Sequence, residues 1–396
     1  MSHLTLVLLA TIAAQVLVTM AAFLPAVLAP VASLDIGVSA SAIGAFTALI
    51  YLIAAISAPL GGGFVAQRGA VRVIQVCLVL AGFGLAICGA AHVAVVIVGA
   101  VIIGCGYGPV TPASSGLLIE HTPDKLRNFI MSIRQTGVPI GGAVAGVVGP
   151  WLTLASGWRT AVLVAGIASV LLAVVLQPLR REFDRPAAGV PERRVAFAQM
   201  ARMVFSHTEL RRMTITSFGY GGMQLCFISY FVVYLADPGG LTVVSAGAAF
   251  SAAMVAGIIG RIAWGIVADY TGDARLVLAA LGGLTALCAV ALTLVGPEWP
   301  YGAVLLLSVV FGASAVGWNG VYIAEIARVA PKGQVAAATG GSLAFTYSGG
   351  VIGPFIFWLI VAATGSYTVA FGSAAVVTLG SAALLVRRIP VSGGAA

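Results

Sequence analysis

Two arginines, Arg134 and Arg261, lie inside long apolar segments of the sequence. Arg134 comes seven residues after Arg127, and Arg261 comes eight residues before Asp269. At a rise of 1.5 Å per residue, each would lie about 10–12 Å from its helix end. A cation near the middle of a bilayer costs at least ~2.5–3.5 kcal/mol and persists only when something compensates it. Because no Asp, Glu or His lies in the middle of any apolar segment, the two arginines are predicted to bind an anion.

The alternative is that each arginine extends its apolar stem along the helix and places its charge at the membrane interface, which needs no ligand. Polar and aromatic side chains elsewhere in the apolar segments bear on this choice. Most Tyr and Trp residues in such helices are packing residues with one satisfied polar end, whereas several together indicate a cavity. The candidates for lining a cavity with the two arginines are Gln15, Tyr51, Tyr107, Tyr220, Gln224, Trp318, Asn319 and Tyr347.

The composition of the 396 residues is that of an integral membrane protein. Apolar residues make up 60% of the chain, charged residues 8%, and the mean hydropathy is +1.09, which is not the composition of a soluble domain. The net charge of +8 does not predict a nucleic-acid partner, because Lys and Arg lie between apolar runs. The five cysteines show no CxxC or Cys/His spacing, so neither a metal site nor a cofactor is predicted.

The apolar runs predict an all-α membrane protein with twelve transmembrane helices, each of roughly 20 residues or more. Placing the N-terminus inside leaves every Lys and Arg in cytoplasmic segments except Arg134, Arg261 and the periplasmic Arg159. Because basic residues favour the cytoplasmic side, both termini are predicted to be cytoplasmic in a multi-pass protein of the cytoplasmic (inner) membrane. The predicted spans lie near residues 5–30, 42–66, 72–91, 93–120, 128–151, 159–179, 212–236, 243–268, 275–296, 299–326, 334–364 and 367–386.

A long polar stretch rich in arginine separates the sixth and seventh spans and is predicted to be cytoplasmic. It divides the chain into an N-terminal six-helix bundle (1–180), a linker (181–211) and a C-terminal six-helix bundle (212–396). Within the linker, Phe197, Met200, Ala201 and Val204 recur at helical spacing. This pattern predicts a short amphipathic helix along the inner membrane surface.

The two halves carry an internal repeat with a nearly constant displacement. Glu120 and Arg127 match Glu325 and Lys332 at a displacement of 205 residues. The pair at 149–150, Gly-Pro, recurs at 353–354. A third match, displaced by 203, aligns Gly62, Ala66, Gly69 and Arg72 with Gly265, Asp269, Gly272 and Arg275. Such a repeat predicts two homologous, pseudo-symmetric six-helix bundles.

At these residues the chain resembles the major facilitator superfamily, whose loop between spans two and three carries a G-x-x-x-D-x-x-G-x-x-R type motif. The resemblance implies that charges at the cytoplasmic helix ends pair and separate between transport states. In the first-half copy Ala66 replaces the acid, so the fuller motif is in the second half. The alternative is that these are interfacial charges, which contribute little when exposed. The predicted gating residues are Arg72, Glu120, Arg127, Asp269, Arg275, Glu325 and Lys332.

Two further segments resemble particular branches of that superfamily. Residues 132–142, around Arg134, resemble the corresponding segment of cyanate, nitrate and related anion porters. The Gly260-Arg261 pair resembles span eight of oxalate/formate antiporters and monocarboxylate porters, in which the arginine binds a substrate carboxylate. The resemblance therefore implies that Arg261 and Arg134 face one central cavity from neighbouring spans.

The predicted function is secondary active transport of a small organic anion, monocarboxylate-like, by alternating access. The expected partners are this substrate, membrane lipids and a co-transported proton or counter-anion, for a protein acting as a monomer. The alternative within transport is efflux of drugs or lipophilic metabolites, although cationic drugs would favour a buried acid, which is missing from the spans. An enzyme is not predicted because no nucleophile, base or paired acids occur at membrane depth. A non-transporting sensor would have the same fold.

Overall fold

The computed structural model describes residues 3–123, 126–184, 197–331 and 334–386, and these residues contain helices but no strand. Twelve helical segments are long and apolar enough to cross a membrane, as the hydropathy predicts. The first half contains α1 (His3–Ile36), α2 (Ile43–Arg68), α3 (Ala70–Cys88), α4 (Val93–His121), α5 (Arg127–Gln135), α6 (Gly137–Ser156), α7 (Trp158–Val175) and α8 (Gln177–Phe183). The second half contains α9 (Phe197–Ser206), α10 (Thr208–Ala236), α11 (Val243–Thr271), α12 (Ala274–Leu292), α13 (Tyr301–Ala315), α14 (Asn319–Val329), α15 (Val335–Thr364) and α16 (Tyr367–Val386).

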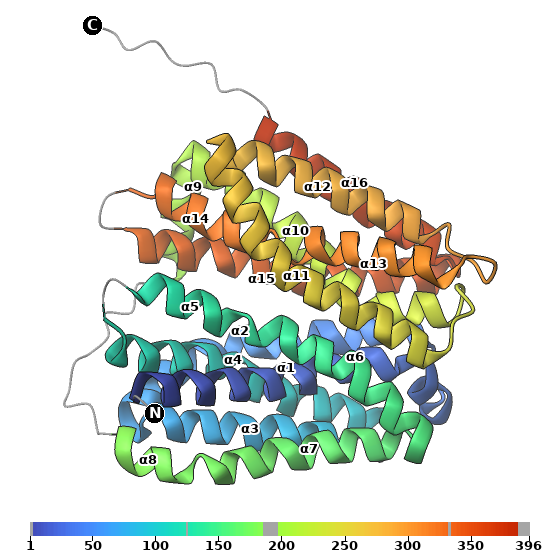
Figure 1. The fold of residues 1–396 in the computed structure, drawn as a ribbon, viewed down its shortest axis with the longest axis horizontal. Coiled ribbons are helices and arrows are strands. Elements are labelled where there is room, and N and C mark those ends of the chain that lie inside the picture. The colour runs from blue at the N-terminus through green and yellow to red at the C-terminus, as the bar shows by residue number, and fades with distance from the viewer. Residues whose placement is uncertain (1–2, 124–125, 185–196, 332–333, 387–396) are drawn as a thin grey trace, which may run out of the picture.

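The helices form two bundles that lie side by side, with the first half in blue to green and the second in yellow-green to red (Figure 1). We call the end that holds His3, Phe183 and Phe197 the linker end, and the opposite end, with the turns at Gly37, Gly157 and Gly240, the loop end. The boundaries proposed from the sequence at residues 180 and 211 stay predictions. In the structure α8 continues to Phe183 and α10 already begins at Thr208.

Two of the predicted spans are not continuous helices. The fifth span is divided at Thr136 into α5 and α6, and the tenth is divided at residues 316–318 into α13 and α14. Pro139 explains the first break in part, because proline has no N–H to donate to the carbonyl four residues earlier. Such freed carbonyls are tolerated at membrane depth only where other protein groups satisfy them. Both breaks therefore create backbone acceptors inside the bundle.

The short helix in the linker, α9, packs against the second bundle. Val204 is fully buried, and the backbone of α9 at Met200 lies next to Gly341 on α15. The ring of Phe205 contacts that of Phe345 edge-on, with centroids 4.9 Å apart. The apolar side of α9 thus covers α15, in addition to any contact with the membrane surface that its amphipathic pattern predicts.

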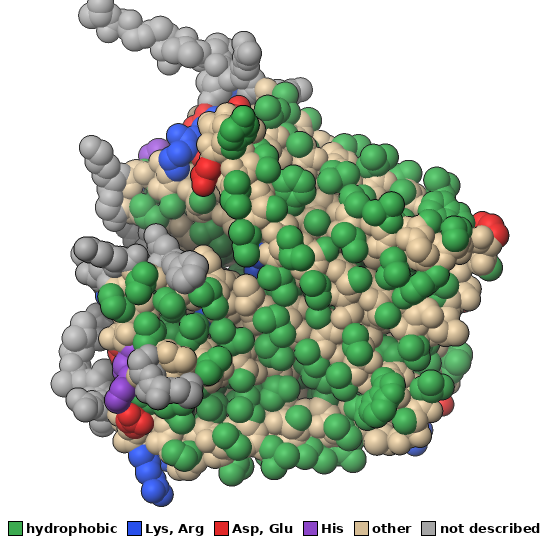
Figure 2. Space-filling view, in the orientation of Figure 1, with side chains coloured by type: hydrophobic (Ala, Val, Ile, Leu, Met, Phe, Trp, Pro, Cys, Tyr) green, Lys and Arg blue, Asp and Glu red, His purple; other side chains and the backbone are tan. Residues whose placement is uncertain are grey.

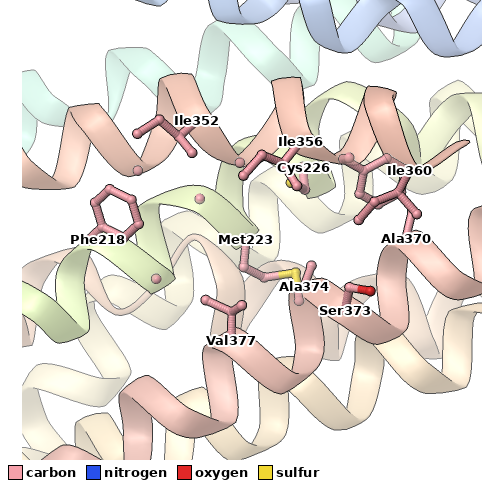
Figure 3. Close-up of a pocket in the computed structure, with 15 residues that line it drawn as sticks. Phe218, Met223, Cys226, Ile352, Ile356, Ile360, Ala370, Ser373, Ala374 and Val377 are labelled. Carbon is pink, nitrogen blue, oxygen red and sulfur yellow. The ribbon is translucent and has the colours of Figure 1, made fainter. Parts of the chain in front are cut away.

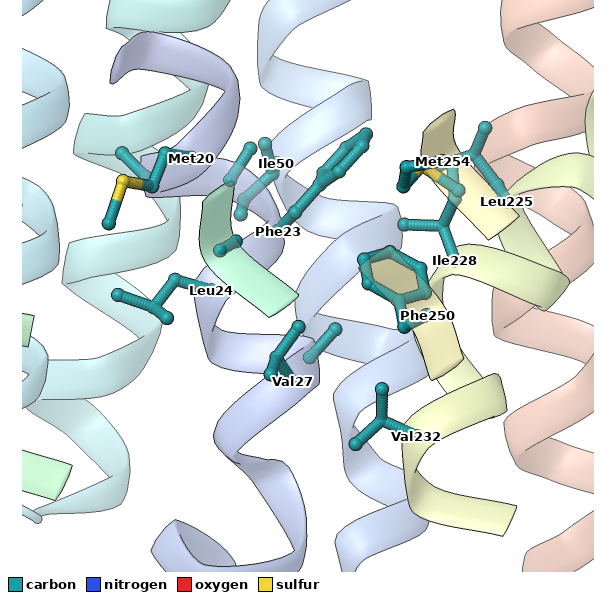
Figure 4. Close-up of a cluster of buried hydrophobic side chains, with 14 of the residues drawn as sticks. Met20, Phe23, Leu24, Val27, Ile50, Leu225, Ile228, Val232, Phe250 and Met254 are labelled. Carbon is teal, nitrogen blue, oxygen red and sulfur yellow. The ribbon is translucent and has the colours of Figure 1, made fainter. Parts of the chain in front are cut away.

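The two halves are packed tightly against each other towards the loop end. A cluster of buried apolar side chains joins α1 and α2 of the first half to α10 and α11 of the second (Figure 4). Its labelled members are Met20, Phe23, Leu24, Val27, Ile50, Leu225, Ile228, Val232, Phe250 and Met254. Nearer the loop end the Tyr230 hydroxyl donates to the Ser41 carbonyl oxygen across the interface at 3.1 Å. These contacts close the loop end of the interface.

Small residues allow α6 and α11 to meet backbone to backbone in this interface. A Cβ atom at Gly247 would lie 2.3 Å from the carbonyl oxygen of Gly146 and 2.6 Å from Cγ of Pro150. Close approach of this kind is how transmembrane helices gain packing energy without a hydrophobic driving force. The loop end is therefore held by a contact that tolerates no added atom.

We predict that Gly247→Ala opens the loop end, because the new methyl group collides with backbone that cannot move locally and overpacking costs about 1–3 kcal/mol. The measurement is the distance between spin labels on Leu34→Cys and Leu294→Cys, which are exposed near the loop end of different halves. Gly265→Ala is the matched control, since nothing lies within 4 Å of a Cβ atom there. An unchanged distance distribution in Gly247→Ala would show that this contact does not hold the halves together.

Candidate functional site

Arg134, near the end of α5, is a fully buried cation. Its side chain is 0% exposed, and its Nη2 donates to Oε1 of Gln15 at 2.8 Å. Its Nε and Nη1 atoms are buried without any hydrogen-bond partner among the described residues. Leaving a buried donor unsatisfied costs about 1–3 kcal/mol, and more when the group is charged. The fold therefore keeps a cation in a state that a suitable acceptor would stabilise.

Gln15 on α1 orients this arginine. Its Nε2 donates to the Thr19 hydroxyl at 3.0 Å, and its Oε1 also accepts from the Thr111 hydroxyl of α4 at 3.3 Å. Helices α1, α4 and α5 thus meet at one amide group, and its oxygen faces Arg134. The two threonines were not singled out from the sequence, because isolated threonines in apolar helices usually bond to their own backbone.

Arg261 on α11 is half-buried and is held by two backbone carbonyls. Its Nε donates to the Val316 oxygen at 3.2 Å, and its Nη1 donates to the Gln135 oxygen at 3.3 Å. Val316 is at the break between α13 and α14, and Gln135 is the last residue of α5 in the other half. Both acceptors lie inside the bundle, so the guanidinium is engaged there instead of extending to the linker end.

Two tyrosines lie near both arginines. Tyr107 and Tyr347 are each close enough to Arg134 and Arg261 to interact electrostatically with both. The hydroxyl of Tyr107 is 3.2 Å from that of Tyr51, and their ring centroids are 5.3 Å apart. Tyr347 is 48% exposed, so water reaches this part of the site. The charged neighbours of the two arginines include no carboxylate among the described residues.

The second half adds a smaller polar group next to Arg261. Oε1 of Gln224 accepts from Trp318 Nε1 and from Asn319 Nδ2, both at 3.1 Å. Asn319 also donates to the Val316 carbonyl at 3.3 Å, which it shares with Arg261. Tyr220, in contrast, donates its hydroxyl to the Leu278 carbonyl of α12 at 2.7 Å and is 4% exposed. The structure therefore places Gln224 and Asn319 with Arg261 and turns the Tyr220 hydroxyl away from it.

Two of the predicted gating charges of the second half, Arg275 and Glu325, form a network near the linker end with Glu209 and Arg328. Glu325, which is 3% exposed, accepts from Arg275 at 3.2 Å and from two nitrogens of Arg328, each at 2.6 Å. Arg275 also pairs with Glu209 at 2.5 Å. All four residues belong to the second half, so the network that the described residues show joins α10, α12 and α14 within that half. Asp269 is exposed on the last turn of α11.

The first half has a different arrangement at the equivalent place. Asp184, just after α8, accepts from the backbone N–H groups of Val71 and Arg72 at 2.8 and 2.9 Å and so caps α3. Partial burial raises the pKa of the Asp184 carboxyl from its ordinary value of 3.8, while the two amide donors act in the opposite direction. The Arg72 side chain donates to Gln75 at 3.4 Å. Glu120 and Arg127 are exposed, and Lys332 lies outside the described residues.

An apolar groove lies on the outside of the second half, between α10, α15 and α16 (Figure 3). It has a cavity volume of about 140 Å³, and no charged residue lines it. Phe218, Met223 and Ile352 are among the side chains at its wall. Its chemistry does not suit an anion. No group of three or more His, Cys, Asp or Glu side chains that could hold a metal ion occurs in the described parts of the chain.

Comparison with known proteins places these features in a family. Residues 11–354 match the model of the Major Facilitator Superfamily. The chain is 26% identical to the "Probable sulfoacetate transporter SauU" of Cupriavidus necator over 372 residues, covering 87% of this chain and 84% of that protein. It is 24% identical to the "Hexuronate transporter" of Bacillus subtilis over 298 residues, covering 68% and 67%.

The fold is also that of solved transporters. A bacterial homologue of the human lysosomal transporter Spinster, in an inward-facing and unoccupied conformation, superposes with a TM-score of 0.75 at 17% identity, covering 98% of this chain and 96% of that one. A POT family transporter in complex with 5-aminolevulinic acid gives a TM-score of 0.78 at 13% identity, covering 96% and 94%. With twelve candidate spans and a family match over most of its length, the chain is a multi-pass membrane protein that belongs to the Major Facilitator Superfamily.

Proposed function

We propose that this protein is a secondary transporter that moves a small organic anion, monocarboxylate-like, across the membrane by alternating access. The observation that carries the proposal is Arg134, a fully buried arginine with two unpartnered nitrogens. It is in the same region as Arg261, and the described residues place no carboxylate beside either arginine. Two cations at membrane depth need compensation. A transported carboxylate supplies both the missing charge and the missing hydrogen-bond acceptors.

The surroundings of the arginines suit a carboxylate on a small organic body. Tyr51, Tyr107 and Tyr347 offer hydroxyl groups together with ring faces, and Gln224 and Asn319 add neutral polar groups. Such a mixture of apolar surface and a few convergent polar groups is typical of small-molecule sites. Because the described neighbours of the arginines provide no acid, a cationic drug would find no counter-charge here.

The packing of the halves supports alternating access. The loop end is closed by the α6–α11 contact and by Tyr230, whereas a recess is visible between the bundles near the linker end, with Lys or Arg atoms in blue inside it (Figure 2). The site lies between these two regions, where a rocking motion of one bundle against the other would expose it to either side in turn. With the linker end cytoplasmic, as the charge distribution predicts, the described state is open to the cytoplasm.

The names of related proteins point in the same direction. Besides the sulfoacetate and hexuronate transporters, they include a "Benzoate transport protein" of Acinetobacter baylyi, 29% identical over 137 residues, and a "Probable galactarate/D-glucarate transporter GudP" of Escherichia coli, 25% identical over 300 residues. All of these compounds are organic acids that are anionic at neutral pH.

The test is a panel of ligands offered to the purified protein in detergent and then to proteoliposomes. Lactate, benzoate, sulfoacetate and galactarate are compared with nitrate, cyanate, neutral sugars and cationic dyes. A ligand at 100 times its Kd raises the stability by about 2.7 kcal/mol, which is visible as a thermal shift. We expect at least one organic anion to stabilise the protein and to be taken up into vesicles. Stabilisation by cationic dyes alone would favour drug efflux instead, and binding without uptake would indicate a sensor.

A further inference from the structure

The carbonyl oxygen of Gln135 lacks its usual helical partner. In an α-helix this oxygen accepts from the N–H group four residues later. That residue is Pro139, which has no N–H, and Pro139 is buried in α6. A carbonyl within a membrane span that has no helical donor is costly unless another group satisfies it. The sequence itself thus creates a vacant acceptor within the fifth span, at the end of α5.

Arg261 of the other half supplies the donor. Its Nη1 donates to the Gln135 oxygen at 3.3 Å, while its Nε donates to the Val316 oxygen at the break between α13 and α14. The Val316 bond lies within the second half, so it can persist when the halves move. The Gln135 bond joins the two halves and cannot survive a large change in their relative position.

The hydrogen bond from Arg261 to Gln135 is the last of a series of contacts along the interface between α6 and α11, which we call the seam. From the loop end inward, the seam contains the contact of Gly146 with Gly247 and the bond from the Ser251 hydroxyl to the Ala143 carbonyl at 2.8 Å. The bond from Arg261 to Gln135 comes next towards the linker end. One turn further along α11 from Arg261, nothing lies within 4 Å of a Cβ atom at Gly265. The Arg261 bond is therefore at the edge of the closed part of the interface.

We propose that Pro139 is a positioning residue for Arg261, because it leaves the Gln135 carbonyl free to accept from that arginine. Arg261 donates to the Gln135 carbonyl in the empty protein and to the substrate anion in the loaded protein. This inference rests on the proposed function, because it assigns a coupling role to the same arginine. A guanidinium donates more strongly to a charged carboxylate than to a neutral carbonyl, so the anion can displace Gln135 from Nη1. Displacement breaks a link between the halves, which connects binding to the motion that follows.

The first experiment is Pro139→Ala, which restores an N–H group to the helix and gives the Gln135 oxygen a donor within its own half. The anion then no longer has to displace that carbonyl. We expect the Kd of the best-stabilising organic anion from the panel to fall about tenfold. The reason is that Arg261 no longer has to break its hydrogen bond to the Gln135 carbonyl before it binds the anion. Pro139→Gly should act in the same direction because it also restores the N–H group. Pro59→Ala, an exposed helix proline on α2, is the control and should leave the Kd unchanged.

The second experiment needs no ligand and is a double-mutant cycle. Spin labels on Leu126→Cys and Tyr270→Cys, exposed residues of different halves near the linker end, report the opening of that end in chains whose five native cysteines are replaced. We expect Pro139→Ala and Arg261→Gln each to lower the population of the open distance severalfold. Combined, they should have no greater effect than either alone, because both remove the same bond.

The outcomes separate this inference from the proposed function. If no anion binds but the cycle is non-additive, Arg261 and Pro139 form the link between the halves and the transported species is not an anion. If anions bind but Pro139→Ala leaves both the Kd and the distances unchanged, the positioning role is wrong while the anion site stands. Additive effects in the cycle would likewise overturn it, since Pro139 would then act on the fold independently of Arg261.

Discussion

Arg261→Gln should reduce anion binding below detection, and Arg261→Lys should weaken it roughly 10- to 100-fold while leaving the fold and membrane insertion intact. The guanidinium already donates to the carbonyls of Val316 and Gln135 and still has Nη2 to offer. A planar group with five N–H donors can keep a backbone bond while it receives a carboxylate. A lysine ammonium is a point charge with three donors and cannot reproduce this geometry.

The measurement for Arg261 is the Kd from thermal shifts, together with initial uptake rates at matched expression. Arg159→Gln and Arg159→Lys are the controls, since Arg159 pairs with Asp35 at 3.5 Å near the loop end and is far more exposed. These controls should bind anions as the unchanged protein does. Near-normal affinity in Arg261→Lys would mean that the arginine only places a charge near the interface, because a lysine stem can do the same.

Arg134→Gln should have opposite effects on stability and on binding. The unliganded protein should become more stable by about 1–3 kcal/mol, because a buried charge with two unsatisfied nitrogens is removed. In the unchanged protein Gln15 accepts a hydrogen bond from Arg134 Nη2, and the amide of a glutamine at position 134 is also a donor. Anion binding should be lost, because the cation that the substrate compensates is missing. Residues of functional sites commonly lower the stability of a protein while they support its activity.

The melting temperature without ligand and the shift caused by anions test the Arg134 prediction together. Arg134→Lys serves as the control that keeps the charge and loses the planar fork, and it should not gain stability. A lower melting temperature in Arg134→Gln would show that the arginine contributes to packing and that its nitrogens are satisfied in the working protein. Normal anion shifts in that variant would move the site towards Arg261 alone.

Most of the helical framework could be predicted from hydropathy. The last two predicted spans, 334–364 and 367–386, nearly coincide with α15 and α16. The breaks at Thr136 and at residues 316–318 were not predicted, because hydropathy places a span without showing where its helix is interrupted. Pro139 was a signal for the first break, since proline removes a helical hydrogen bond. The second break contains no proline, and its Val316 carbonyl accepts from Arg261 on α11, a tertiary contact that local sequence does not reveal.

The candidate site could be predicted only in part. Side chains that are out of place in an apolar helix, such as Arg134 and Gln15, carry a strong signal. Backbone acceptors carry none, so the roles of the Gln135 and Val316 carbonyls needed coordinates. Tyr220 and Gln224 are four residues apart and share a helix face, yet the long tyrosine side chain reaches the backbone of α12 while the amide stays beside Trp318. Side-chain length decided that difference.

The gating charges show a similar limit. The spacing of Glu325 and its neighbours predicted pairs that make and break between the halves. In the described state Arg275 and Arg328 occupy the Glu325 carboxylate from within the same half. Arg328 follows Glu325 by three residues, a spacing that favours contact on a helix. Sequence alone could not tell an intrahelical partner from one in the opposite bundle.

The capping of α3 by Asp184 determines how the protein can be divided. In the second half the corresponding helix, α12, is capped by Asp273 directly before it, whereas α3 takes its carboxylate from a residue more than a hundred positions later. Ala70 stands where the repeat would place that aspartate, and Gly69, with φ +86°, leaves room for Asp184. A split version produced as two polypeptides therefore needs its break point after Asp184. A cut at residue 180 would assign the cap of the third helix to the wrong fragment.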